Sequence, residues 1–204
     1  MTHKSPFYII EEFISPLMCE DIIDRMNNTY PNMDDAGNPL LTIKSNRLTE
    51  IRILPLILDI VPDLEQYYGF TYAGTLPFDL EWYPENFRNS AAHCENSNLI
   101  KGKWYRTNEK DFVGVIFLND SRDTPPFDPY FEVVGGKLAF PTHNFSFIPK
   151  RGQLVLFPGE QHFVNATQDV LYGDLHQIKF YISAENDYVY DPRQFPGTYK
   201  QWFA

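Results

Sequence analysis

The chain has 204 residues, of which 43% are hydrophobic, and carries a formal net charge of -10. This length suits one domain with a full hydrophobic core. An acidic chain without a basic cluster is a poor ligand for phosphate backbones, which argues against nucleic acid as a partner. Two cysteines, Cys19 and Cys94, do not make a disulfide framework, and no apolar run reaches the roughly 18 residues of a membrane span. We therefore expect a cytoplasmic protein with no membrane partner.

The first part of the chain predicts a short strand followed by a helix. The strand is expected from Phe7 to Phe13, where aromatic and β-branched residues predominate. Ser15 and Pro16 then indicate a helix start, because serine caps the first turn and proline is tolerated at the first helical position. Apolar residues at helical spacing continue this helix to Met26.

A second helix is expected from Ile51 to Tyr68. Pro55 and Pro62 fall inside this segment and are expected to start or kink it, since proline removes a helical hydrogen bond. Gly69 suits the residue just beyond its end.

From residue 70 onward the pattern changes to short strands joined by turns. The chain is rich in strand-forming aromatics and in turn residues, with 17 Phe, 13 Tyr, 16 Pro and 11 Gly. Eight strands after two helices predict a mainly β (α+β) fold, a jelly roll or double-stranded β-helix with the N-terminal helices packed on one sheet. We expect one domain over 1–204, with a strand and helices in 1–70, the jelly-roll core in 71–185 and a C-terminal extension in 186–204. The predicted strands are Phe78–Tyr83, Ala91–Glu95, Phe112–Asn119, Gly136–Phe140, Phe145–Ile148, Gln153–Phe157, His162–Asn165 and Leu175–Ile182.

The segment His93-Cys94-Glu95 is the strongest candidate for chemistry. Residues i and i+2 of a strand point to the same face, so an imidazole and a carboxylate are aimed at one point, while Cys94 points the other way and packs. A second histidine from a distant strand would complete a two-His, one-carboxylate set with open metal positions. The short pattern alone is weak evidence, because it also fits polar surface residues.

The wider sequence resembles the prolyl 4-hydroxylase branch of the Fe(II)/2-oxoglutarate-dependent oxygenases. Similar motifs occur in the same order along most of the chain, and the interval of ten residues from Tyr83 to His93 also matches. These motifs are Tyr83-Pro84-Glu85-Asn86, His93-Cys94-Glu95-Asn96, the strand Gly114–Asn119, the Gly-Gly strand Gly135–Pro141, and Pro149–Phe157 followed by His162.

The resemblance implies an iron site made by His93, Glu95 and His162. It also implies that 2-oxoglutarate and O2 are co-substrates, with ascorbate as a supporting reductant, and that succinate and CO2 are released. The hydroxylated substrate would be a protein side chain, with prolyl as one candidate, or a small molecule. Tyr83 would hydrogen-bond a carboxylate of 2-oxoglutarate. A buried structural histidine is the other interpretation of His162.

The chain departs from the family at two places. Glu95 stands where the family usually has Asp, which keeps the same ligand atom on a side chain one methylene longer. The family also carries a Lys or Arg about ten residues beyond the distal His, and here that stretch is Leu171–Gly173. In the family this cation binds the far carboxylate of 2-oxoglutarate, a dianion that needs a positive partner in a buried pocket. Lys179, expected on the inner face of the last strand, is our first choice, His176 the second and Arg106 the third.

The substrate and the catalytic status stay open at this stage. Substrate loops are expected from Asn27 to Ser45 and from Ser121 to Val133, because binding residues concentrate on loops. One alternative is a jelly-roll binding or structural module without catalysis, and another is a cupin-type metalloenzyme with a different ligand set.

Overall fold

The computed structural model describes residues 4–29, 42–44, 47–124, 128 and 130–203. The elements are β1 (Tyr8–Ile10), α1 (Pro16–Thr29), β2 (Thr42–Lys44), α2 (Arg47–Tyr68), β3 (Tyr72–Tyr83), β4 (Ser97–Ile100), β5 (Lys103–Arg106), β6 (Phe112–Phe117), β7 (Asp120–Arg122), β8 (Glu132–Gly135), β9 (Leu138–Phe140), η1 (Pro141–His143), β10 (Phe145–Phe147), β11 (Leu154–Pro158), η2 (Gln161–Phe163), β12 (Ala166–Thr167), β13 (Val170–Tyr172), β14 (Leu175–Ala184) and α3 (Tyr199–Trp202). The two longer helices, α1 and α2, lie in the first third of the chain, and most of the strands follow them.

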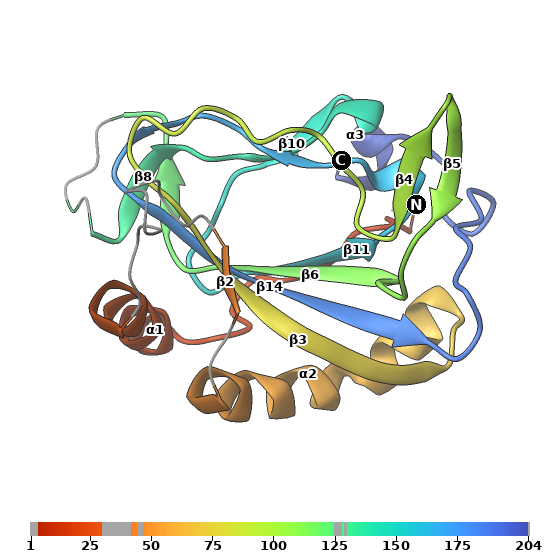
Figure 1. Ribbon diagram of the computed structural model, residues 1–204, viewed down its shortest axis with the longest axis horizontal. Coiled ribbons are helices and arrows are strands. Elements are labelled where there is room, and N and C mark those ends of the chain that lie inside the picture. The colour runs from red at the N-terminus through yellow and green to blue at the C-terminus, as the bar shows by residue number, and fades with distance from the viewer. Residues whose placement is uncertain (1–3, 30–41, 45–46, 125–127, 129, 204) are drawn as a thin grey trace.

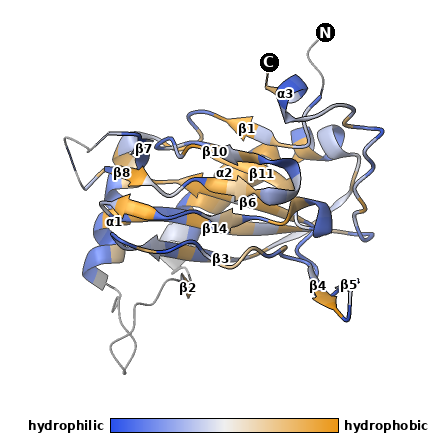
Figure 2. Ribbon diagram, turned by 90° about the horizontal axis from the view of Figure 1, so that it is seen from above, coloured by the Kyte–Doolittle hydropathy of each residue, from blue (hydrophilic) through white to orange (hydrophobic). Residues whose placement is uncertain are grey.

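A six-stranded antiparallel sheet in the order β1-β11-β6-β14-β3-β2 forms one wall of the fold. Smaller sheets in the orders β10-β9-β12 and β13-β8-β7 lie across from it, and α1 and α2 cover its outer side (Figure 1). This arrangement is a double-stranded β-helix, so the predicted fold and the predicted position of the helices are confirmed. A separate hairpin, β4-β5, stands away from the body (Figure 2).

The central strand β14 separates an apolar face from a polar one. His176 lies on the helix side, because its Nε2 is 3.2 Å from the Asn27 side-chain oxygen in α1. Phe180 shares that face by strand alternation and packs against Phe78. Lys179 therefore points the other way, into the space between the sheets, as the sequence predicted. This alternation gives the fold a polar interior at one end of an otherwise apolar core.

Helix α2 runs without interruption through Pro55 and Pro62, and it begins at Arg47, four residues before the predicted start. The residues four positions earlier, Ile51 and Leu58, are 57% and 44% exposed. The prolines lack an N–H and cannot donate to the carbonyl oxygens of these two residues, so water can donate to them instead. None of the helices in the described ranges is long and apolar enough to cross a membrane.

The helix ends and several strands were predicted correctly. Ser15 caps α1 through its hydroxyl, which accepts a hydrogen bond from the Met18 N–H at 3.2 Å. Gly69 follows α2 with a φ of 73°, a left-handed conformation that suits glycine.

Two predicted strands are wrong. Residues 162–165 begin in the 3-10 turn η2, and within 91–95 only His93 pairs, in an isolated bridge with Asn165. The strand predicted to start at Phe78 starts at Tyr72 instead.

Candidate active site

His93 and Glu95 meet where the space between the sheets opens to solvent: the His93 side chain is half exposed and the Glu95 side chain is buried. The His93 Nδ1–H donates to the Ala91 carbonyl oxygen at 2.9 Å, which leaves Nε2 facing Glu95. Nε2 lies 3.1 Å from the Glu95 Oε1 atom. Two donor atoms about 2.1 Å from one metal at a right angle are about 3 Å apart, so this spacing suits adjacent metal ligands. The predicted convergence of this pair is thus present.

Backbone pairing fixes this segment although it is not a regular strand. His93 and Asn165 exchange two hydrogen bonds, with N···O distances of 3.0 and 2.7 Å. The Glu95 N–H donates to the Gly159 carbonyl at 2.9 Å. Cys94 points away from the site, is 6% exposed, and donates its thiol hydrogen to the Ser97 carbonyl at 2.9 Å. Cys94 therefore has the packing role that its position predicted.

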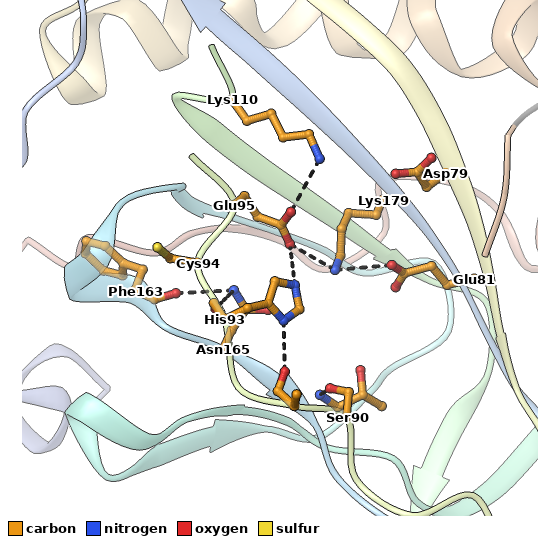
Figure 3. A network of polar contacts seen from close by, with 12 residues as sticks. Asp79, Glu81, Ser90, His93, Cys94, Glu95, Lys110, Phe163, Asn165 and Lys179 are labelled. Atoms are coloured by element: carbon orange, nitrogen blue, oxygen red, sulfur yellow. Dashed lines mark hydrogen bonds and ion pairs between the residues drawn. The ribbon is translucent and has the colours of Figure 1, made fainter. Parts of the chain in front are cut away.

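The Glu95 carboxylate is buried among cations. Lys179 Nζ lies 3.2 Å from Oε1, and Lys110 Nζ lies 3.5 Å from Oε2 (Figure 3). Burial acts to raise the pKa of Glu95, but the charge of Lys179, the hydrogen bond from His93 and the charge of Lys110 outweigh it and hold the pKa well below its ordinary range. The hydrogen bond to Glu95 in turn raises the pKa of His93. Glu95 is therefore ionised at neutral pH.

A second buried carboxylate, Glu81, lies on the other side of Lys179. Its Oε1 is 3.2 Å from Lys179 Nζ, and its Oε2 accepts hydrogen bonds from Gln177 Nε2 at 2.6 Å and from the Tyr83 hydroxyl at 3.0 Å. Burial acts to lower the pKa of Lys179, yet the charges of Glu81 and Glu95 prevail and raise it well above its ordinary value. The ammonium group of Lys179 thus links two carboxylates in the interior.

His162 does not join His93 and Glu95 in this conformation. It lies in η2 with its side chain half exposed, and its Nδ1 is 2.5 Å from the Glu160 Oε1 atom. Among the residues that the structure describes, no three His, Cys, Asp or Glu side chains are grouped so that they could hold one metal ion. The residue directly across from His93 is Asn165, which is 1% exposed and is labelled beside His93 in Figure 3.

The other two candidates for the cation that binds 2-oxoglutarate, His176 and Arg106, contact other residues. His176 is 2% exposed on the helix side of β14, and burial lowers its pKa to about 4, so it is neutral near pH 7. Arg106 pairs with Asp111 at 2.7 Å and with Asp187 at 3.3 Å, beside the β4-β5 hairpin.

A cleft of about 660 Å³ lies beside the site, against the segment that leads into His93. Small and apolar side chains form much of its wall, and polar ones stand among them. They include Ala91, Ala92, Ala139, Ala166, Asp123 and Lys137. Asp123 belongs to the predicted substrate loop Ser121–Val133, part of which lies outside the described residues. The other predicted loop, Asn27–Ser45, lies mostly outside them as well.

The sequence prediction missed Glu81, Gln177, Lys110 and Asn165. A signal for the first was available, because Asp79, Glu81 and Tyr83 alternate with apolar residues along one strand. Such alternation is typical of a strand with one face in water, and the structure buries both faces instead. Asn165 carried no comparable signal, since only the pairing with His93 gives it a role.

The fold is that of known prolyl hydroxylases. No family model matches the sequence, and a search of curated proteins gives no match. Among solved structures, a viral collagen prolyl hydroxylase from Paramecium bursaria Chlorella virus-1, in a complex with 2-oxoglutarate, superposes with a TM-score of 0.65 at 12% identity, covering 88% of this chain and 97% of that one.

Two further structures are similar. A Trichoplax adhaerens prolyl hydroxylase, bound to a peptide fragment of the hypoxia-inducible factor oxygen degradation domain, has a TM-score of 0.60 at 14% identity and covers 89% and 84% of the two chains. A Pseudomonas putida prolyl-4-hydroxylase has a TM-score of 0.59 at 14% identity and covers 91% and 95%.

Proposed function

Because the chain has the fold of the prolyl hydroxylases, we propose that it is an Fe(II)- and 2-oxoglutarate-dependent dioxygenase. The observation that carries this proposal is the His93–Glu95 pair, whose donor atoms are 3.1 Å apart beside a buried cation. An imidazole and an ionised carboxylate are the donor types that ferrous iron accepts. The two residues therefore fit iron as adjacent ligands.

His162 is the proposed third ligand. To serve, its imidazole has to move toward His93 and Glu95, because the three side chains are not grouped in this structure, where Nδ1 contacts Glu160 at 2.5 Å. The ring is half exposed, so this movement does not require the core to open. Asn165 is the competing candidate, because it faces His93 directly. Bound iron would supply the oxidation of the substrate by O2 together with 2-oxoglutarate, and the chain supplies the pocket, the charges and the orientation.

We further propose that Lys179 and Tyr83 bind the far carboxylate of 2-oxoglutarate. Lys179 is 4% exposed and Tyr83 is 6% exposed, and both have their polar atoms in the interior. A charged donor and a hydroxyl in such a site give short, strong hydrogen bonds to an anion. Burial raises the pKa of Tyr83, which keeps the hydroxyl protonated and able to donate.

The substrate proposed is a protein side chain, with prolyl as one candidate, or a small molecule that enters through the cleft beside Ala91 and Ala92. The small side chains of the cleft wall leave about 660 Å³ for it. The similar proteins include one solved with a peptide, which supports a peptide substrate without identifying it.

The decisive experiment is an anaerobic titration of the metal-free protein with Fe(II) and 2-oxoglutarate. A visible metal-to-ligand charge-transfer band and slow release of succinate with O2 and ascorbate are expected. Glu95→Ala should abolish both, and His162→Ala should do the same. Glu160→Gln is the matched variant: it removes the negative charge beside the His162 Nδ1 atom and should bind iron at least as tightly as the natural protein.

The outcomes separate the proposals. Loss of the band in Asn165→Ala but not in His162→Ala would move the third ligand to Asn165. Absence of iron binding and of 2-oxoglutarate binding in the natural protein would leave a non-catalytic jelly-roll module as the function.

A further inference from the structure

Three hydrogen-bond donors converge on one carboxylate inside the barrel. Glu81 receives Gln177 Nε2 at 2.6 Å, the Tyr83 hydroxyl at 3.0 Å and Lys179 Nζ at 3.2 Å. We call Tyr83, Gln177 and Lys179 the carboxylate cradle. All three residues, and Glu81 itself, are at most 6% exposed. The amide and the hydroxyl donate to Oε2 and the ammonium group contacts Oε1, so together they satisfy both oxygens of one carboxylate.

The cradle includes the two residues that the proposed function assigns to the co-substrate. Lys179 and Tyr83 are the proposed partners of the far carboxylate of 2-oxoglutarate, and in this structure both are bound to Glu81. We propose that the cradle is a carboxylate-binding site that the chain's own Glu81 fills in the resting protein. A ligand carboxylate has to displace Glu81 in order to bind there.

The charges explain why displacement is required. Lys179 already lies 3.2 Å from two carboxylates, Glu81 and Glu95. A third carboxylate added to this group would be repelled strongly, because like charges in a poorly solvated interior are screened weakly. Binding then occurs only in the fraction of molecules in which Glu81 has left the cradle, and the apparent affinity falls by that fraction. Glu81 acts in this way as an internal inhibitor.

The geometry defines the ligand class as small carboxylic acids. The part of Glu81 that reaches beyond Cβ is a CH2–COO⁻ group, which has the size and charge of acetate. Removing this group leaves the cradle with its three donors and a space of that shape. The identity of the natural ligand as 2-oxoglutarate rests on the proposed function, whereas the cradle itself does not.

The test compares Glu81→Ala with Glu81→Gln in the full chain. Glu81→Ala opens the space and removes the charge, so acetate should raise its melting temperature above the effect of sodium chloride at equal ionic strength. Glu81→Gln keeps the space filled and still accepts a hydrogen bond, so acetate should have no such effect. The dissociation constant of 2-oxoglutarate, measured by calorimetry without iron, should be at least about ten times lower in Glu81→Ala than in the natural protein.

Each outcome decides the matter. Equal responses of Glu81→Ala, Glu81→Gln and the natural protein to acetate would overturn the proposal. If acetate raises the melting temperature of Glu81→Ala but 2-oxoglutarate binds no more tightly, the cradle is supported and 2-oxoglutarate is excluded as its ligand. Glu81→Asp serves if Glu81→Ala does not fold even with acetate: its shorter side chain withdraws the carboxylate from the cradle, so tighter 2-oxoglutarate binding supports the proposal and unchanged binding refutes it.

Discussion

His176 should make the stability of the protein depend on pH in the weakly acidic range. Its ring is 2% exposed, between the Asp174 carbonyl at 3.1 Å from Nδ1 and the Asn27 side-chain oxygen at 3.2 Å from Nε2. Burial lowers its pKa from 6.5 to about 4 in the folded protein. An unfolded chain regains a pKa of about 6.5, so it binds more protons than the folded one between these values.

The sign and size of the effect follow directly. Stability is full above pH 6.5 and is lost as the pH falls toward 4, because the unfolded state gains the proton first. Between pH 6.5 and about 4 the free energy of unfolding falls by about 1.4 kcal/mol per pH unit, which amounts to about 3 kcal/mol.

Urea unfolding at pH 7.0, 6.0 and 5.0 should show about 2 kcal/mol of this loss, because pH 5.0 lies about 1.5 units below 6.5, and His176→Gln is the reference. The variant is less stable at pH 7, since it loses the packed ring, but its stability should fall less steeply below pH 6.5. Carboxylates and the other histidines titrate in both proteins and cancel in the difference between the two curves. Identical slopes for the two proteins would refute the assignment of a neutral, buried His176.

Two further substitutions test the interior. Lys179→Met leaves two buried carboxylates without their shared cation and should lower the free energy of unfolding in urea by about 3–5 kcal/mol. The control is Lys110→Met, at a 26% exposed side chain, which should lower it by about 1 kcal/mol or less. Similar losses in the two variants would contradict the bridging role of Lys179. Gly114→Ala places a Cβ 2.2 Å from the Phe180 ring and should lower the free energy of unfolding by about 1–3 kcal/mol. Its control in thermal melts is Gly74→Ala, whose Cβ meets no atom within 4 Å. Equal melting temperatures would show that the Phe180 ring moves aside at no measurable loss of stability.

The parts of the fold that depend on local chemistry could be predicted from the sequence. Ser15 and Gly69 mark the helix ends through caps that need only neighbouring residues. The alternation of Lys179 with Phe180 assigned the two faces of β14, because a strand has a fixed period of two. The same rule predicted His93 and Glu95 on one side, and they do meet, although an isolated bridge and not a strand holds their segment.

The remaining parts depend on contacts between distant segments. Residues 162–165 have the composition of a strand, yet Phe163 turns its ring into the core, where it is fully buried, and η2 forms instead. The partner of His93 is set by the bridge to Asn165, which no local pattern reveals. Alternation with apolar residues, as around Glu81, is typical of a face in water, and only the folded barrel brings Gln177 and Lys179 to this carboxylate. The sequence pattern thus predicts which face of a strand a side chain lies on, whereas the distant residue that it contacts is set only by the folded structure.

The place of β14 in the sheet has a consequence for the order of folding. This strand pairs with β3 on one side and with β6 on the other, although it follows both of them in the chain. A growing chain that ends before Leu175 exposes two long strand edges with nothing between them. Unpaired edges of this kind invite association with other chains, and contacts between segments this far apart form slowly. The sheet can close only after β14 has been synthesised, so nascent or truncated forms that lack it should be prone to aggregate.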